Sequence, residues 1–263
     1  MNNFALKSSR FATASSWIAT THSGTANTKG SWVTVIASTS KEANRLAVSA
    51  GFGTVFRDCL FDIGIGSAGN EVIVINNIPV SEFSDENPIW LDFPVSIPSG
   101  SRIAVRQQAT NTSGSFRVVA HPYWGDVPRG THGIYTYGAD TSASRGTQID
   151  PGGTGNVKGS WTQITSSTSV NHSMLWVAIA GAGVSRFTMK FQLDIGVGAA
   201  SSESVLIPDL ELYTYSVTDA FNPTYFGPFP VQIPAGTRLA GRALNDANAS
   251  GTGRIIDVIL FGA

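Results

Sequence analysis

The stretch that decides the fold is Lys29–Trp32, Lys-Gly-Ser-Trp, because the same four residues return as Lys158–Trp161. The second copy begins in the second half of the chain, so the repeated unit is about half the chain long. A repeat of this length corresponds to a whole domain, since the units of solenoid proteins repeat every ~20–50 residues. The chain of 263 residues is therefore expected to contain two related domains.

Further matches extend the repeat towards the end of each copy. Asp62–Gly66, Asp-Ile-Gly-Ile-Gly, meets Asp194–Gly198, Asp-Ile-Gly-Val-Gly, at a slightly larger separation than Lys29 and Lys158. Near the end of each copy, Arg117 meets Arg254 at a separation that is larger again. The growing separation indicates short insertions in the second copy.

The repeat also sets the expected domain boundaries. The two domains are expected at residues 25–125 and 154–263. Residues 1–24 precede the first domain as an N-terminal arm or edge strand, and residues 126–153 form a linker with a second arm.

Short segments rich in Val, Ile and Phe alternate with clusters of Gly, Pro, Ser and Asn, and no segment predicts a helix. This pattern is typical of β-sandwiches. The expected strands of the first copy are 32–37, 45–49, 58–65, 71–75, 89–95, 102–107 and 116–121. Those of the second copy are 161–165, 175–180, 190–197, 204–207, 225–231, 238–243 and 254–261. The prediction is an all-β chain of two tandem, internally duplicated, jelly-roll-like β-sandwich domains.

Composition narrows the classes of partner. Charged residues make up 13% of the chain, against roughly 25% in average soluble domains. The net charge of -1 gives no electrostatic basis for binding nucleic acid or an anionic membrane. The longest apolar run, 175–184, is too short to span a bilayer. Residues 1–16 lack the apolar core of a secretory signal, so synthesis in the cytoplasm is expected.

The cysteine and the histidines predict no metal, cofactor or nucleophile. Cys59 is the single cysteine and lies in an apolar strand, where a buried thiol is expected. The four histidines do not have the paired spacing of a zinc site; they are His22, His121, His132 and His172.

A pair of carboxylates occurs in both copies and has three possible interpretations. They could cap a turn or pair with arginine, supply oxygen ligands to Ca²⁺, or act as the two carboxylates of a glycoside hydrolase. We favour the structural interpretation, because each copy also carries arginines after its Pro-x-Gly turn. The residues expected in these turns and salt bridges are Asp62, Glu71, Arg102, Asp194, Glu203 and Arg238.

Aromatic residues are concentrated in 213–229 of the second copy. They could belong to a core strand, anchor a protein interface, or stack on sugar rings. The residues expected at an interface or binding surface are Trp17, Trp90, Tyr213, Tyr215, Phe221, Tyr225 and Phe226.

The combination of Asn-x-Lys-Gly-Ser-Trp, Asp-Ile-Gly-x-Gly and Ile-Pro-x-Gly-x-Arg in a weakly charged, duplicated β chain resembles virion accessory proteins of tailed bacteriophages. These are capsid decoration (cement) proteins and tail-attached β-sandwich modules. The resemblance implies a non-enzymatic virion protein, made in the host cytoplasm, that contacts the major capsid protein and forms a homo-oligomer, for which a trimer is one candidate. Many shallow contacts would then add up through avidity. A tail-associated glycan-binding or receptor-binding module and a glycoside hydrolase remain as alternatives.

Overall fold

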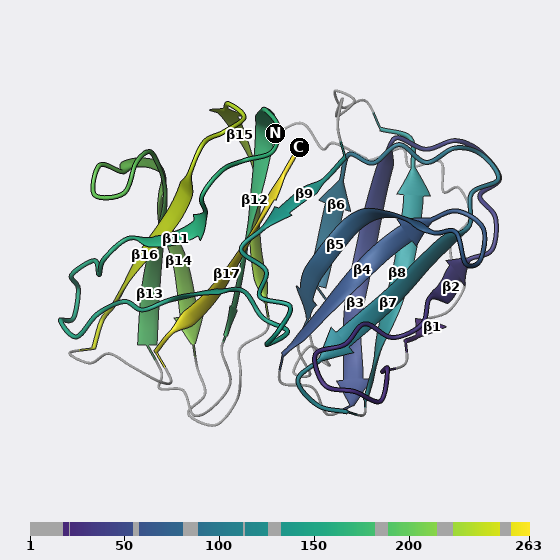
Figure 1. Ribbon diagram of the computed structural model, residues 1–263, viewed down its shortest axis with the longest axis horizontal. Helices are drawn as coiled ribbons and strands as arrows, with labels where there is room; N and C mark the ends of the chain where they lie inside the picture. The colour runs from purple at the N-terminus through teal and green to yellow at the C-terminus, as the bar shows by residue number, and fades with distance from the viewer. Residues whose placement is uncertain are drawn as a thin grey trace, which may run out of the picture.

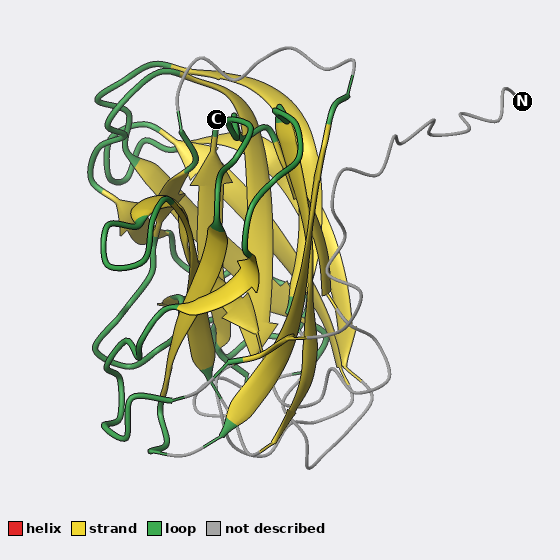
Figure 2. Cartoon of the chain, turned by 90° about the vertical axis from the view of Figure 1, so that its right-hand side faces the viewer, coloured by secondary structure: helices red, strands yellow, loops and turns green. Residues whose placement is uncertain are grey.

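The structure is a computed structural model that describes residues 18–20, 22–54, 58–80, 89–112, 114–125, 133–181, 189–214, 223–247 and 254–263. The described residues form strands and loops without any helix (Figure 2). Consequently, none of the described segments is a helix long and apolar enough to cross a bilayer.

The described residues of the first half form eight strands: β1 (Ile18–Ala19), β2 (Val33–Ile36), β3 (Arg45–Thr54), β4 (Cys59–Ile65), β5 (Val72–Val80), β6 (Ile89–Phe93), β7 (Ile103–Ala109) and β8 (Ser115–Tyr123). The linker contributes β9 (Tyr135–Tyr137) and β10 (Thr147–Ile149). The second half continues with β11 (Thr162–Thr165), β12 (His172–Gly181), β13 (Met189–Val197), β14 (Ser204–Thr214), β15 (Thr224–Ile233), β16 (Leu239–Asn245) and β17 (Ile256–Gly262).

Each half folds into a sandwich of two antiparallel sheets (Figure 1). In the first sandwich, β1-β8-β3-β6 form what we call the front sheet, and β2-β7-β4-β5 form the back sheet. In the second sandwich, the front sheet is β10-β17-β12-β15 and the back sheet is β11-β16-β13-β14, with β9 also paired to β17. Most connections cross between the two sheets of a sandwich, as in a jelly roll. The prediction of an all-β chain with two tandem β-sandwiches is confirmed.

The registers correct the sequence alignment of the last strand. Leu46 lies opposite Pro122, and its counterpart Leu175 lies opposite Gly262. Pro122 is therefore the counterpart of Gly262, whereas the match of Arg117 with Arg254 would have placed it on Ile259. The sequence alignment of this end rested on Asn111, Ser113, Gly114, Arg117 and Gly125, most of which are residue types common in turns and weak markers of register in an apolar strand.

Several strands are longer than predicted, and β5 and β14 show one physical reason. The expected strands ended at Ile75 and Ile207, because the residues that follow are typical of turns. In the structure, Asn77 and Asp209 have positive φ angles of 56° and 49° and form bulges, after which β5 and β14 continue along their partners. A bulge of this kind bends a strand without ending it.

The two central strands of the second front sheet, β12 and β17, are buried on both faces. Along β12, Val177 and Ile179 point into the core of the second sandwich, while Trp176 and Ala178 join the core of the first. β17 alternates in the same way, with Leu260 in the second core and neighbouring side chains in the first. The two sandwiches therefore share a continuous apolar contact.

The linker ties the two sandwiches together. Besides pairing β9 and β10 with β17, it bonds to the first sandwich. Thr136 Oγ1 donates to the Asn76 carbonyl (2.8 Å). Ser144 Oγ donates to Asn27 Oδ1 (2.8 Å), and Gln108 Nε2 donates to a linker carbonyl (2.7 Å).

Candidate functional site

Asp62, in β4, is the centre of a buried polar cluster. Lys29 Nζ donates to Asp62 Oδ1 at 2.7 Å, and Arg106 Nε donates to Oδ2 at 2.9 Å. The backbone N–H of Asn77, at the β5 bulge, also donates to Oδ1 at 2.9 Å. Only 2% of the Asp62 side chain is exposed. The carboxylate thus joins the chain before β2 to β4, β5 and β7.

Trp32 completes this cluster and explains the glycine in Asp-Ile-Gly. The guanidinium of Arg106 lies over the Trp32 ring, 4.6 Å from its centroid. A Cβ at Gly64 would lie 2.8 Å from the Trp32 ring, closer than non-bonded carbon atoms approach. The repeated motifs Lys-Gly-Ser-Trp and Asp-Ile-Gly are therefore two halves of one packing arrangement.

The second sandwich repeats the cluster. Asp194 accepts hydrogen bonds from Lys158 Nζ (2.7 Å) and Arg242 Nε (2.9 Å), and a third comes from the backbone N–H of Asp209 (3.0 Å). Arg242 lies 4.5 Å from the centroid of the Trp161 ring. Burial of Asp194 opposes its ionisation, but these hydrogen bonds outweigh it and lower the pKa of the carboxyl below its usual value.

The other repeated carboxylates are held by arginine. Arg102 Nη1 donates to Glu71 Oε1 at 2.5 Å, and Arg238 Nη1 donates to Glu203 Oε1 at 2.7 Å. Desolvation opposes ionisation of both glutamates, but the arginine and backbone hydrogen bonds outweigh it and lower each pKa. A glycoside hydrolase would need one such carboxyl to keep its proton, which requires a raised pKa.

The hydrogen bonds of the carboxylates also bear on the Ca²⁺ interpretation. The oxygens that would bind a cation already accept hydrogen bonds from Lys, Arg or backbone N–H groups, as described for Asp62 and Asp194. Within the ranges that the structure describes, no three His, Cys, Asp or Glu side chains are grouped to hold a metal ion.

The surroundings of Cys59, His172 and His22 consist of buried packing or hydrogen bonds within the chain. Cys59 is fully buried and burial raises the pKa of its thiol, which disfavours the reactive thiolate. His172 is buried, with Nε2 2.8 Å from the hydroxyl of Tyr137. His22 Nδ1 accepts a hydrogen bond from the backbone N–H of Gly24 (3.1 Å). His132 lies outside the described residues.

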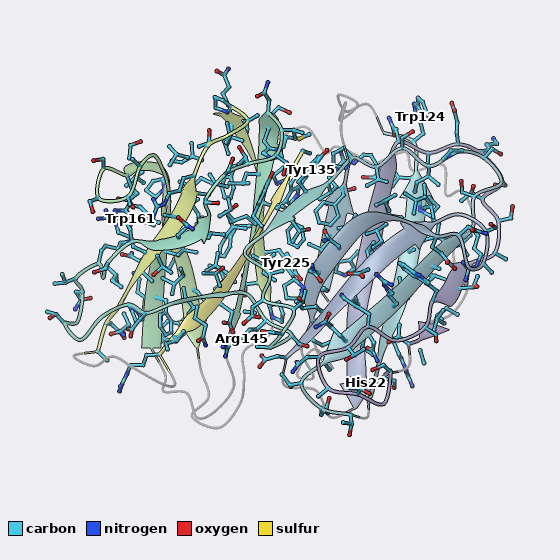
Figure 3. All side chains as sticks on the ribbon, in the orientation of Figure 1. His22, Trp124, Tyr135, Arg145, Trp161 and Tyr225 are labelled. Carbon is cyan, nitrogen blue, oxygen red and sulfur yellow. The ribbon has the colours of Figure 1, made fainter. Side chains whose placement is uncertain are left out.

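The aromatic residues of 213–229 do not form a single binding surface in the described part of the chain. Tyr225 lies at the boundary between the two sandwiches (Figure 3), where its hydroxyl donates a hydrogen bond to the carbonyl of Pro79. Phe226 packs against the core of the second sandwich, whereas 48% of Tyr213 is exposed. The hydroxyl of Tyr225 is therefore used in a contact within the chain. Trp17, Tyr215 and Phe221 lie outside the described residues.

The contact between the sandwiches is an aromatic cluster that the sequence analysis missed. The ring centroid of Phe93 is 5.3 Å from that of Trp176 and 5.5 Å from that of Phe261. The signal was present in the long apolar run of β12, because a strand buried on both faces has no polar residues at alternate positions.

The front sheet of the first sandwich has a different outer face. Trp90 is 62% exposed and stacks on His121, with ring centroids 6.0 Å apart and an interplanar angle of 17°. Beside it, Asp92 accepts hydrogen bonds from Arg45 (2.7 Å to Nη2) and from Tyr123. Burial and the neighbouring Asp92 raise the pKa of Tyr123 to about 12. This face combines an exposed indole with a charged network that holds its surroundings in place.

An open pocket of about 400 Å³ lies over the Asp62 cluster of the first sandwich. Its wall consists of polar side chains with one apolar residue, and Thr141 of the linker forms part of the rim. The lining residues include Asn27, Lys29, Asn76, Asn77, Arg106 and Gln108. Its volume is within the range of small-molecule sites.

Comparison with known proteins gives no family. No family model matches the chain, and no curated protein matches it. Among solved structures, the CBM22-1–CBM22-2 tandem domain of Paenibacillus barcinonensis Xyn10C is similar at 11% identity with a TM-score of 0.22, covering 97% of this chain and 94% of that one. A chain of the T=1 particles derived from infectious bursal virus has 9% identity and a TM-score of 0.14, covering 97% of this chain and 74% of that one. Neither likeness supports a conclusion about function.

Proposed function

We propose that the protein is a structural component of a tailed-bacteriophage virion, and specifically a capsid decoration protein that binds the major capsid protein. The observation that carries this proposal is the outer face of the first front sheet, where Trp90 is 62% exposed. On the equivalent face of the second sandwich, side chains of β12 and β17 are covered by the first sandwich. A sheet face of this fold, with an exposed tryptophan, suits contact with another protein, because tryptophan is enriched at the centres of protein interfaces.

Two further features support an assembly role. The shared apolar contact and the linker hydrogen bonds join the two sandwiches, so they can present their surfaces together. Multivalent attachment of this kind gains avidity without a deep binding site. Jelly rolls also occur in viral capsid proteins and in lectins, an analogy of fold that is compatible with this function without selecting it.

The experiment is to locate the protein on purified particles by imaging and to count its copies by quantitative mass spectrometry. Copies spread over the shell in numbers comparable to the major capsid protein are expected. A few copies confined to the tail would move the function to an adsorption or baseplate module. Absence from particles would reject a virion role.

A tail-associated glycan-binding module is the second candidate, and the open polar pocket favours it. Amide and charged side chains such as Asn76 and Gln108 line this pocket, and such groups can hydrogen-bond sugar hydroxyls. A glycan array with the whole protein tests the candidate. Binding that is lost in Asn76→Ala and retained in Trp90→Ala would support it, and absence of binding across the array would reject it.

A further inference from the structure

The chain contains the same two surface elements twice. Each sandwich has an outer face on its front sheet and, on each of two sides, a pair of edge strands from its two sheets; we call one of these two sides the open side. The open side consists of β5 and β6 in the first sandwich and of β14 and β15 in the second. Within the chain, the outer face of the second front sheet packs on the open side of the first sandwich (Figure 1). One face and one open side are therefore left over.

The contact between the two sandwiches within the chain shows which interactions join such a face to such an open side. The face supplies Trp176 and Phe261, which pack on Phe93 at the end of β6. At its margin, Tyr225 of β15 donates a hydrogen bond to the carbonyl of Pro79 in β5. An aromatic side chain with a polar tip thus reaches a backbone acceptor on the edge strand.

The outer face of the first front sheet, on which no part of the chain that the structure describes packs in this way, carries an aromatic residue equivalent to Tyr225. Ser49 and Ala178 occupy matching positions in β3 and β12, and they lie opposite Trp90 and Tyr225 respectively. Trp90 is therefore the counterpart of Tyr225, and its indole N–H is a donor as the tyrosine hydroxyl is. Tyr225 is covered within the chain, but Trp90 is exposed on the surface.

The leftover open side carries matching apolar groups. In β6, every second side chain is buried: Ile89, Leu91 and Phe93. In β15, by contrast, Ile233 is the single fully buried residue. Three apolar side chains of this side are only partly buried, although their counterparts in the first sandwich are buried. They are Phe226, Phe229 and Val231, in the positions of Leu91, Phe93 and Val95.

We propose that the outer face of the first front sheet binds the open side of the second sandwich of another copy of this chain. Trp90 takes the place that Tyr225 has in the internal contact. Its acceptor is the backbone carbonyl of Glu211, because Glu211 pairs with Gln192 as Pro79 pairs with Leu60. The inference goes beyond the role on a particle and does not depend on it. Both contacts use the face that carries Trp90, so a copy that is bound to another copy in this way does not bind the capsid protein through that face.

This contact joins two different surfaces, so it is heterologous and leads to a ring or an open chain of copies. It is weaker than the internal contact, because the face has smaller and more polar groups. Ala47 and His121 stand where the second sandwich has Trp176 and Phe261. Association that depends on concentration is expected.

Sedimentation velocity of the whole protein over a range of concentrations tests the proposal. The mass is expected to increase with concentration, and Trp90→Ala should weaken association at least ~tenfold, since removal of a central interface tryptophan has an effect of that size or more. Val231→Lys, on the open side, should have a similar effect. Trp124→Ala is the matched control, because it removes another surface tryptophan, 39% exposed, and should change nothing. Circular dichroism checks that each variant is folded.

Mixing the variants distinguishes this contact from a symmetric one. Trp90→Ala keeps an intact open side and Val231→Lys keeps an intact face, so an equimolar mixture should form dimers and no larger species. A symmetric contact gives no such recovery. A mixture that stays monomeric overturns the proposal, as does wild-type protein that stays monomeric at every concentration. Association that appears only after removal of residues 1–17 also overturns it, by assigning the face to the N-terminal arm. Copies found on particles despite a monomeric protein in solution would leave the particle proposal standing.

Discussion

The two sandwiches have the same interior polar cluster and different outer faces. Asp62 and Asp194 hold a lysine and an arginine at matching distances in the two copies. In contrast, Trp176 of the second front sheet is 3% exposed and its counterpart in the first sheet is Ala47. The cluster needs every member at once, because removal of one leaves a buried charge behind. The residues on the outer face of a sheet can differ between the two copies, because they depend on whether protein or solvent covers that face.

The difference shows that the same sandwich fold can have its front sheet either buried against another domain or exposed on the surface, in one chain. Strands β12 and β17 of the second front sheet form an internal layer that is apolar on both faces, whereas the first front sheet has an outer face with Trp90 and the Arg45–Asp92 pair. Each of the following experiments compares a residue with its counterpart or with a matched control.

Trp176→Ala should have the largest effect. Truncation of a buried tryptophan costs about 3–5 kcal/mol in the free energy of unfolding. Because Trp176 packs on Phe93 of the other sandwich, we also expect unfolding to separate into two transitions. Urea unfolding followed by circular dichroism measures both. Trp90→Ala, which removes an exposed ring, should change stability by less than about 0.5 kcal/mol; equal losses in the two variants would contradict a shared core.

Asp62→Ala should destabilise the protein by about 3 kcal/mol, because Lys29 is left as a buried charge without its carboxylate. Burial already lowers the pKa of Lys29. Asp194→Ala should cost ~1 kcal/mol less, since Lys158 keeps a second carboxylate, Asp209, at 2.9 Å.

Asp140→Ala is the control for both variants. Asp140 is a partly exposed aspartate whose nearest Arg145 nitrogen is 3.7 Å away and whose Oδ1 accepts hydrogen bonds from the backbone N–H and the hydroxyl of Ser142. Its removal should cost about 1 kcal/mol, less than removal of either buried aspartate. If the Asp62 and Asp194 variants were as stable as this control in urea unfolding, the cluster would not contribute to the fold.

Gly64→Ala and Gly196→Ala should each cost about 1–3 kcal/mol, the usual effect of overpacking. The added Cβ would lie 2.8 Å from the Trp32 ring in the first sandwich and 2.6 Å from the Trp161 ring in the second, so Gly196→Ala should be the more destabilising. Gly133→Ala serves as the control, because its Cβ would meet nothing within 4 Å. Thermal unfolding compares the three, and a Gly64 variant with the melting temperature of the control would contradict the packing.

Tyr225→Phe should have the smallest effect, about 1 kcal/mol at neutral pH, from the lost hydrogen bond to Pro79. Burial raises the pKa of Tyr225 well above its usual value of 10. The contribution of the hydroxyl is therefore complete below pH 10 and is lost as the pH rises further, because the unfolded tyrosine ionises first. Wild-type stability should fall more steeply with pH in this range than that of Tyr225→Phe. Tyr123, whose pKa is also raised, is present in both proteins, so parallel curves would contradict the assignment.

Much of the fold could be predicted from local patterns. The repeat of Lys29–Trp32 indicated two domains, and strands such as β4 and β7 lie within a residue or two of their predicted bounds. Strands β5 and β14 were predicted too short, since a bulge and a turn use the same residue types. The arginine partners of Glu71 and Glu203 were predicted from the repeat, but the lysine partners of the aspartates were not, because Lys29 and Asp62 lie far apart in sequence and meet only when the sheets form.

The sequence by itself determined that the chain is all-β and duplicated. Strand periodicity and repeated motifs are local patterns, which can be recognised from the order of residues alone. Only the tertiary structure decided that Tyr225 is an internal contact while Trp90 stays on the surface. Both are aromatic residues at matching positions of an edge strand, so nothing in their own sequence separates them. Burial depends on what packs against a residue from elsewhere in the chain, and here that is the other sandwich.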